Sequence, residues 1–171
     1  MLIYELSLAT VVGINIIQAI GLNLITGYCG QISLGHAAFY GIGAYTAALM
    51  AKAGFPGAVS LIAAMLLTGT VGAVVGLTSL RVREDFLAIT TMGVGFLFLG
   101  IVRQQEHFLG GELGISSIPS FGLGKVGFFI LVALLAALCA AFSLYLKKTW
   151  MGFAFEAVAD DEDTARVLLS L

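Results

Sequence analysis

Acidic and basic residues divide the chain into long uncharged runs made mostly of apolar residues. A helix needs ~20 apolar residues to cross a bilayer core ~30 Å thick. Three of the runs therefore each fit one crossing, and the first run is long enough for two elements. The uncharged runs lie at 6–51, 53–80, 86–102 and 126–146.

Glycines at positions 27, 30 and 35 mark a break inside the first run. The pattern therefore predicts an all-α polytopic membrane protein with about five transmembrane or re-entrant helices. We expect residues 1–171 to form one membrane domain, with a cytoplasmic segment at 147–171. The predicted helices lie at about 6–26, 33–51, 57–80, 86–103 and 126–146.

Composition strengthens the membrane assignment. Hydrophobic residues make up 60% of the chain and charged residues 11%, whereas an average soluble domain has roughly 25% charged residues. This difference excludes an ordinary soluble domain. The net charge of −2 also argues against a nucleic-acid partner, for which a basic stripe is expected.

Basic residues predict the orientation in the membrane. The pairs Arg81/Arg83 and Lys147/Lys148 stand at the ends of two predicted helices, where the positive-inside rule is strongest, so we place both pairs in the cytoplasm. This orientation puts the amino terminus, the 52–56 turn and the 104–124 loop outside, and the 27–32 turn and the carboxyl-terminal tail inside.

Small residues recur every four positions along the segment at 57–80. Such a ridge lets another helix backbone approach closely, so it predicts close helix packing. The alternative is that glycine and alanine are simply common in membrane helices. The ridge consists of Ser60, Ala64, Thr68, Gly72 and Gly76.

The stretch 27–45 holds five glycines together with Gln31, Ser33 and His36. Glycine at this density makes a continuous helix costly, and irregular backbone at membrane depth is tolerated only where protein or a water-filled cavity surrounds it. One interpretation is a broken or re-entrant element that lines a substrate path. The other is a tight cytoplasmic turn followed by a closely packed helix in which His36 is hydrogen-bonded at an interface.

Asn15 and Gln18 are three positions apart and so share one face of the first helix. Amides inside a membrane helix either join helices or line a path. No acidic residue lies within a predicted span, which does not favour a proton- or sodium-coupled carrier. As a hypothesis, the substrate path is lined by Asn15, Gln18, Gln31, Ser33 and His36.

Motifs for catalysis and cofactor binding are missing from the sequence. There is no GxSxG, HExxH or GxxxxGK[ST] pattern, and neither Cys29 nor Cys139 lies in a CxxC motif. We therefore expect no catalytic residues, no metal site and no cofactor. If nucleotide hydrolysis drives this protein, another chain performs it.

Three stretches resemble one family. GYCGQISLGHAAFYGIGAYTAAL at 27–49, preceded by IGLNLITG, resembles the signature near the front of LivM-type permeases, the membrane subunits of ABC importers for branched-chain amino acids. GGELGISSIP at 110–119 is similar to an external loop of that family. MGFAFEAVADDEDTARVLL at 151–169 is similar to its cytoplasmic segment that contacts the ATPase.

The resemblance implies an importer subunit in a multi-pass arrangement in a bacterial or archaeal plasma membrane. Its implied partners are membrane lipid, a second permease subunit, ATP-binding cassette ATPase subunits and an extracytoplasmic substrate-binding protein. The chain departs from the family at Phe153, Glu156 and Ala159, where basic residues are common, and at Leu169, where glycine is common. The implied ATPase-coupling residues are Gly152, Ala157, Asp160, Asp161 and Glu162.

The residues of the carboxyl-terminal tail also predict a structure by their spacing alone, independently of the family resemblance. Glu156, Asp160 and Asp163 lie on one side of a helix, which predicts an amphipathic cytoplasmic helix that fits a groove in a partner. The alternative is a solvated acidic tail. The apolar contacts of this helix would come from Val158, Ala165 and Leu168.

Two further alternatives concern function. Urea and short-chain amide importers have similar permeases, and a non-transporting membrane fragment or assembly subunit would insert and pair through the small-residue ridge without coupling. Members of the family are generally longer, with more helices after the coupling segment. The resemblance therefore carries the expectation that this sequence is truncated: a fragment, a frameshifted product or a minimal half.

Overall fold

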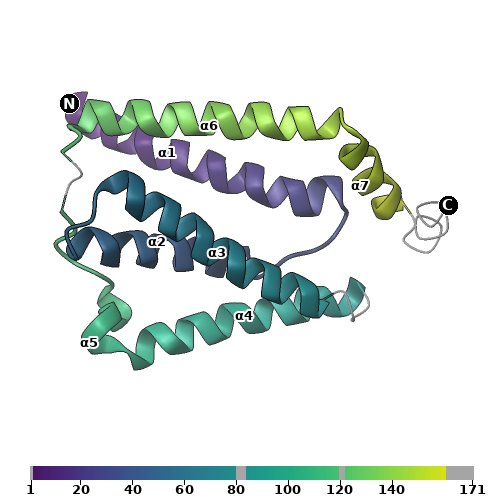
Figure 1. The fold of residues 1–171 in the computed structure, drawn as a ribbon, viewed down its shortest axis with the longest axis horizontal. Helices are drawn as coiled ribbons and strands as arrows, with labels where there is room; N and C mark the ends of the chain where they lie inside the picture. The colour runs from purple at the N-terminus through teal and green to yellow at the C-terminus, as the bar shows by residue number, and fades with distance from the viewer. Residues whose placement is uncertain (1, 80–83, 120–121, 161–171) are drawn as a thin grey trace. The chain divides into compact units, whose positions relative to one another are not determined.

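The computed structural model of the chain describes residues 2–79, 84–119 and 122–160, and within these ranges it contains helices and irregular connections but no strand. Figure 1 shows their arrangement. The elements are α1 Leu2–Asn23, the π-helical turn η1 Leu24–Tyr28, α2 His36–Lys52, α3 Gly57–Ser79, α4 Glu84–Gln104, α5 Glu106–Leu109, the 3-10 turn η2 Gly111–Leu113, α6 Lys125–Lys147 and α7 Trp150–Asp160.

Four helical stretches are long and apolar enough to cross a membrane. They are Ile3–Tyr28, Gly57–Thr78, Leu87–Gln104 and Lys125–Lys147. With 17 residues, α2 spans only ~26 Å at the helical rise, which is less than the ~30 Å core. The prediction of an all-α polytopic membrane protein is confirmed, and α2 is the short element among the five expected.

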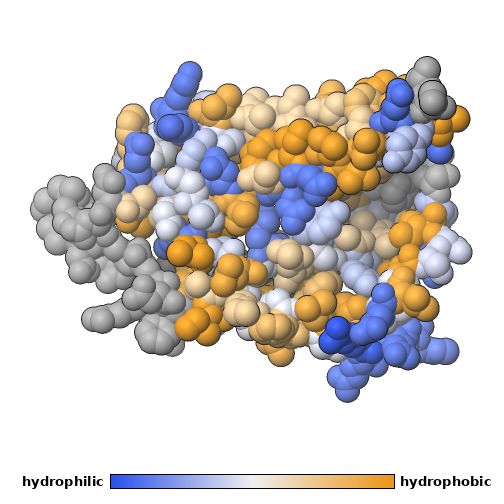
Figure 2. Space-filling model, turned by 180° about the vertical axis from the view of Figure 1, so that it is seen from behind, coloured by the Kyte–Doolittle hydropathy of each residue, from blue (hydrophilic) through white to orange (hydrophobic). Residues whose placement is uncertain are grey.

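The surfaces of these helices are largely apolar and uncovered. Only 6% to 11% of the membrane-spanning part of each stretch is buried inside the molecule. Large side chains such as Leu66 and Leu97 are about two-thirds exposed. Figure 2 shows hydrophobic residues over much of the face that it displays. Apolar surface on this scale requires lipid or further protein around the helices.

The chain divides into two compact units. The first, called the α1/α6 unit, contains residues 1–32 and 123–171, and the second, called the α2/α3/α4 unit, contains residues 33–122. The second unit is therefore inserted in the sequence of the first. That the two work as one permease domain stays a prediction.

In the α1/α6 unit, the two long helices pack side by side and run parallel (Figure 1). Gly13 faces Val132, where a Cβ on the glycine would lie 2.8 Å from Val132 Cγ1. Further along both helices, the Tyr28 and Ser143 hydroxyl oxygens are 3.1 Å apart. Both helices consequently end on the same side, as the predicted orientation requires, while the side itself stays a prediction.

In the α2/α3/α4 unit, α2 packs against both α3 and α4. Gly43 faces the Thr68 hydroxyl of α3, with 3.2 Å between the glycine's would-be Cβ and Thr68 Oγ1. On the side of α2 that packs against α4, Gly41 faces the ring of Phe98. These two glycines lie inside a regular helix, and their missing side chains make room for α3 and α4.

The ridge on α3 lies partly against α2. Ser60 is fully buried and Ala64 is 6% exposed, and a Cβ on Gly72 would lie 4.0 Å from Phe39 Cε1 of α2. The hydroxyl of Thr68 is buried without a hydrogen-bond partner among the described residues. Gly76, by contrast, has no described atom within 4 Å of the position of a Cβ.

Candidate functional site

The break expected in the glycine-rich stretch lies between η1 and α2, from Cys29 to Gly35. Before it, α1 widens into the π turn, where the side-chain oxygen of Asn23 occupies the space that a Cβ on Gly27 would need. Such π turns are frequent at functional sites. The chain then turns at Gly30, which adopts the left-handed φ of 69°.

Cys29, the first residue of the break, carries an uncharged thiol that is hydrogen-bonded to the helix before it. Its thiol donates a weak hydrogen bond to the Leu24 carbonyl, with Sγ 3.5 Å from the oxygen. Partial burial raises the pKa of the Cys29 thiol above its ordinary value, because burial disfavours the charged thiolate. Cys29 therefore stays protonated at neutral pH and caps the end of the helix.

The far end of the break is fixed to α4 through Thr91. The Leu34 N–H donates to Thr91 Oγ1 at 3.1 Å, and Gly35 lies directly against the Thr91 carbonyl oxygen, which occupies the position of a would-be Cβ. Thr91 is itself buried, and its hydroxyl also bonds the Ala88 carbonyl at 3.0 Å. Only glycine fits at position 35 without a shift of the backbone.

The five residues predicted to line a substrate path fall in both units. Asn15 is exposed and Gln18 is half-buried on α1, and Gln31 is half-buried in the break, all in the α1/α6 unit. Ser33 and His36 are half-buried at the start of the α2/α3/α4 unit. That these residues share one path stays a prediction.

A sharp corner separates α6 from α7. The N–H of Thr149 and its hydroxyl both donate to the Leu146 carbonyl, at 3.0 Å and 2.7 Å, which satisfies a carbonyl that the end of α6 would otherwise leave unpaired. Gly152 is buried in this corner, where a Cβ would lie 2.5 Å from the carbonyl oxygens of Leu146 and Lys147. The predicted coupling residue Gly152 thus allows α7 to fold back closely on α6.

The π turn η1, the start of the break, the end of α6 and α7 meet in one cluster, which we call the coupling junction; it consists of Tyr28, Gly30, Ser143, Lys147 and Ala159. A Cβ on Gly30 would lie 3.2 Å from both Cα and Cβ of Ala159 near the end of α7. The hydroxyls of Tyr28 and Ser143 are within hydrogen-bond distance, and Lys147 Nζ lies 5.8 Å from the centroid of the Tyr28 ring, in the range of a cation–π contact. The break is therefore in direct contact with α7.

The remaining predicted coupling residues lie along or beyond α7. Ala157 is half-buried, and Glu156 is exposed; Asp160 is the last residue of α7. Asp161 and Glu162 lie outside the described residues, as do Asp163, Ala165 and Leu168 of the predicted amphipathic helix.

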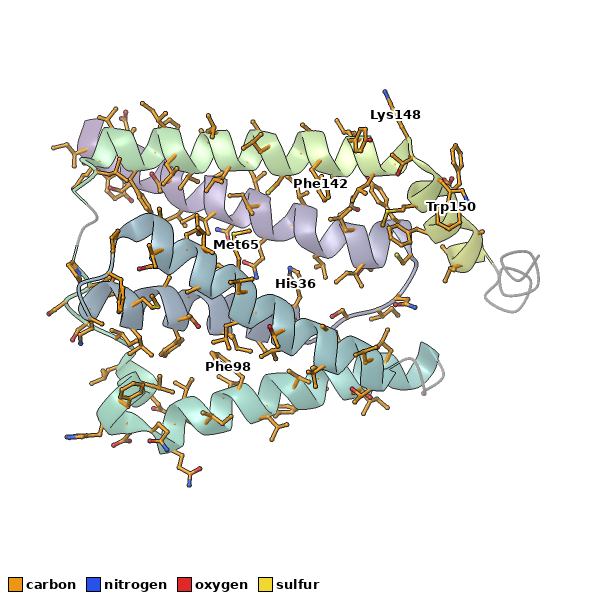
Figure 3. The ribbon with its side chains drawn as sticks, in the orientation of Figure 1. His36, Met65, Phe98, Phe142, Lys148 and Trp150 are labelled. Carbon is orange, nitrogen blue, oxygen red and sulfur yellow. The ribbon has the colours of Figure 1, made fainter. Side chains whose placement is uncertain are left out.

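The first turn of α7 exposes large apolar side chains that the acidic pattern of the tail did not indicate. Trp150 is 72% exposed and Phe153 is 64% exposed, and Figure 3 shows Trp150 on α7 beyond the corner, with Lys148, the residue after α6, projecting outward from the corner. Tryptophan beside lysine at the end of a spanning helix is typical of a membrane–water boundary. The start of α7 therefore has the composition of a boundary segment.

Comparison with known proteins decides the family. The family described as "Branched-chain amino acid transport system / permease component" matches residues 4–168. The chain belongs to this family. The resemblance in the three sequence stretches is thereby confirmed, and it extends over almost the whole chain.

Two curated relatives of this permease-family chain are transport permeases. This chain is 33% identical to the high-affinity branched-chain amino acid transport system permease protein LivM of Salmonella typhimurium LT2, over 96% of its own length and 46% of the relative. It is 34% identical to LivM of Escherichia coli K12, over 94% of its own length and 45% of the relative. The chain thus spans slightly less than half the length of these relatives. No solved structure matches it.

Proposed function

We propose that this chain is a membrane-spanning permease subunit of an ABC importer, which moves branched-chain amino acids or a related small polar compound into the cell. Separate ATPase subunits drive it, and the chain itself performs no catalysis. The family match over residues 4–168 carries this proposal. Its location would be a bacterial or archaeal plasma membrane, with a second permease subunit and an extracytoplasmic substrate-binding protein as further partners.

The coupling junction gives the proposal a physical route. In this account the ATPase binds α7 and the acidic residues after it. A movement of α7 about the Gly152 corner then acts on the break through the contact between Gly30 and Ala159. The Tyr28–Ser143 hydroxyl pair holds η1 to α6. The movement of α7 therefore changes the conformation of the break and leaves the packing of α1 on α6 unchanged.

The side chains assigned to the path suit a zwitterionic solute. Amides, a hydroxyl and an imidazole can bind a carboxylate and an ammonium group without a fixed charge that would hold the solute too tightly. We therefore propose that Asn15, Gln18, Gln31, Ser33 and His36 contact the solute as it passes the break. Energy for uphill movement comes from the ATPase.

Removal of the acidic residues at the end of α7 tests the ATPase contact. The triple variant Asp160→Ala, Asp161→Ala, Glu162→Ala should bind the ATPase subunit about tenfold more weakly, because three charged contacts are lost. Co-purification of the ATPase from membranes with equal amounts of inserted permease measures this. The matched control is Glu106→Ala, an exposed carboxylate in the loop expected outside. Equal ATPase recovery with the triple variant and with the control would refute the contact.

A further inference from the structure

A cavity of about 480 Å³ lies at the last turns of α4, within the α2/α3/α4 unit. One wall is apolar and aromatic: the rings of Tyr45 and Phe98 meet edge to face, with centroids 5.8 Å apart, and Val102 is buried beside them. The lining also includes one cation and one anion, Arg103 and Glu112. A volume of this size is typical of small-molecule sites.

The loop that brings Glu112 to this cavity is built on glycines. Gly110, Gly111 and Gly114 have φ values of 79°, 56° and 69°, in the left-handed region that glycine adopts without strain. The turn is so tight that Gly110 lies against the Gly114 carbonyl. This conformation returns the chain to α4 and places Glu112 Oε1 3.2 Å from Arg103 Nε.

The ion pair at the cavity is readily opened. The side chains of Arg103 and Glu112 are 66% and 75% exposed, and an exposed ion pair contributes little to stability. A ligand that brings its own carboxylate to Arg103 and its own ammonium group to Glu112 replaces one ion pair by two. A guanidinium can hold a carboxylate by two parallel hydrogen bonds.

We propose that this cavity is an outer binding site for a free α-amino acid with an apolar side chain. The ligand's carboxylate binds Arg103, its ammonium group binds Glu112, and its side chain packs on Tyr45, Phe98 and Val102. The inference rests on the proposed function, because it gives an importer a place to receive its solute at the end of α4 that the charge pattern puts outside. The two charges and the apolar wall together select this class over urea, which carries neither charge nor an apolar side chain.

Saturation-transfer NMR of L-leucine with the full chain in lipid nanodiscs tests the site. Saturation should pass from the wild-type protein most strongly to the leucine methyl groups, since these contact the aromatic residues of the cavity. Arg103→Gln and Glu112→Gln should each weaken leucine binding about tenfold or more, because each removes a charge-assisted contact. Lys52→Gln, which removes an exposed cation outside the cavity, is the matched control and should bind leucine like the wild type.

Two leucine analogues distinguish recognition from a structural effect of the variants. 4-Methylpentanoate lacks the ammonium group, so its binding should fall in Arg103→Gln and persist in Glu112→Gln. 3-Methylbutylamine lacks the carboxylate, so its binding should show the opposite pattern. A merely structural ion pair would not produce this crossed result.

The outcomes also separate this site from the proposed function, because the measurement needs neither ATPase nor binding protein. No saturation transfer from the wild type to leucine, or equal transfer from the wild type and both variants, would overturn the site even if the complete transporter imports leucine. A separate co-precipitation with the binding protein adds one outcome: if both variants lose that docking and bind leucine like the wild type, the surface is a protein-docking site and the proposal is wrong. The crossed pattern in a complex that does not transport would leave the site standing and refute the function.

Discussion

Replacing Gly35 with alanine is expected to lower the stability of the α2/α3/α4 unit by ~3 kcal/mol. The added Cβ would overlap the carbonyl oxygen of Thr91, a backbone atom that cannot rotate away as a side chain can. The start of α2 would have to move off α4, which also breaks the hydrogen bond from the Leu34 N–H to Thr91 Oγ1. The fraction of purified protein that stays monodisperse in size-exclusion chromatography after heating measures this loss.

Gly93→Ala is the matched control for this prediction. Gly93 lies in α4, close to Thr91 in sequence, but no described atom lies within 4 Å of its would-be Cβ. Alanine there should stabilise the helix by about 0.5–1 kcal/mol, since glycine is unfavourable in a helix interior. If Gly35→Ala resists heat as well as Gly93→Ala, the close contact between the break and α4 is wrong.

Gly30→Val is expected to reduce ATP-driven uptake by the complete transporter by ~10-fold or more, the size of a typical coupling free energy between two sites. Valine disfavours the left-handed φ of 69° at this position. Its side chain would also push on Ala159, which already lies 3.2 Å from the position of a Cβ. Since α7 contacts the break here, the ATPase should continue to hydrolyse ATP while less solute is moved.

Gly54→Val separates backbone strain from loss of coupling. Gly54 has a left-handed φ of 85°, but its would-be Cβ has open space among the described residues, so valine there should carry similar strain without touching α7. The measured quantity is the ratio of leucine imported to ATP hydrolysed in proteoliposomes. Equal ratios for the two valine variants would show that the Gly30–Ala159 contact transmits nothing.

The sequence alone could predict the helices and the place of the break for simple physical reasons. Uncharged length decides which segments can cross a bilayer, so the spans follow from the positions of Lys, Arg, Asp and Glu. The glycines at 27, 30 and 35 indicated where helix would stop, and the structure places non-helical residues from Cys29 to Gly35. The recurrence of small residues every four positions along 57–80 also predicted close packing at Ser60 and Ala64, and both residues are buried.

Other features could not be read from local patterns because they depend on contacts distant in sequence. The hydroxyl pair of Tyr28 and Ser143 joins residues 115 positions apart, and neither residue stands in a motif. Gly41 and Gly43 belong to the glycine-rich stretch for which a broken element was one interpretation, yet they lie in a continuous helix, where their missing side chains make room for Phe98 and Thr68. Only the fold shows which glycines bend the chain and which admit a neighbour.

The most direct test of the central claim is solute uptake by the complex that contains this chain, purified gently from its native membranes and reconstituted in liposomes with ATP. We predict ATP-dependent accumulation of L-leucine that excess L-valine or L-isoleucine suppresses and excess urea does not. A co-purified ATP-binding cassette ATPase should be present in the same preparation. Uptake of urea in place of leucine, or recovery of the chain without an ATPase and without ATP-dependent uptake, would contradict the account.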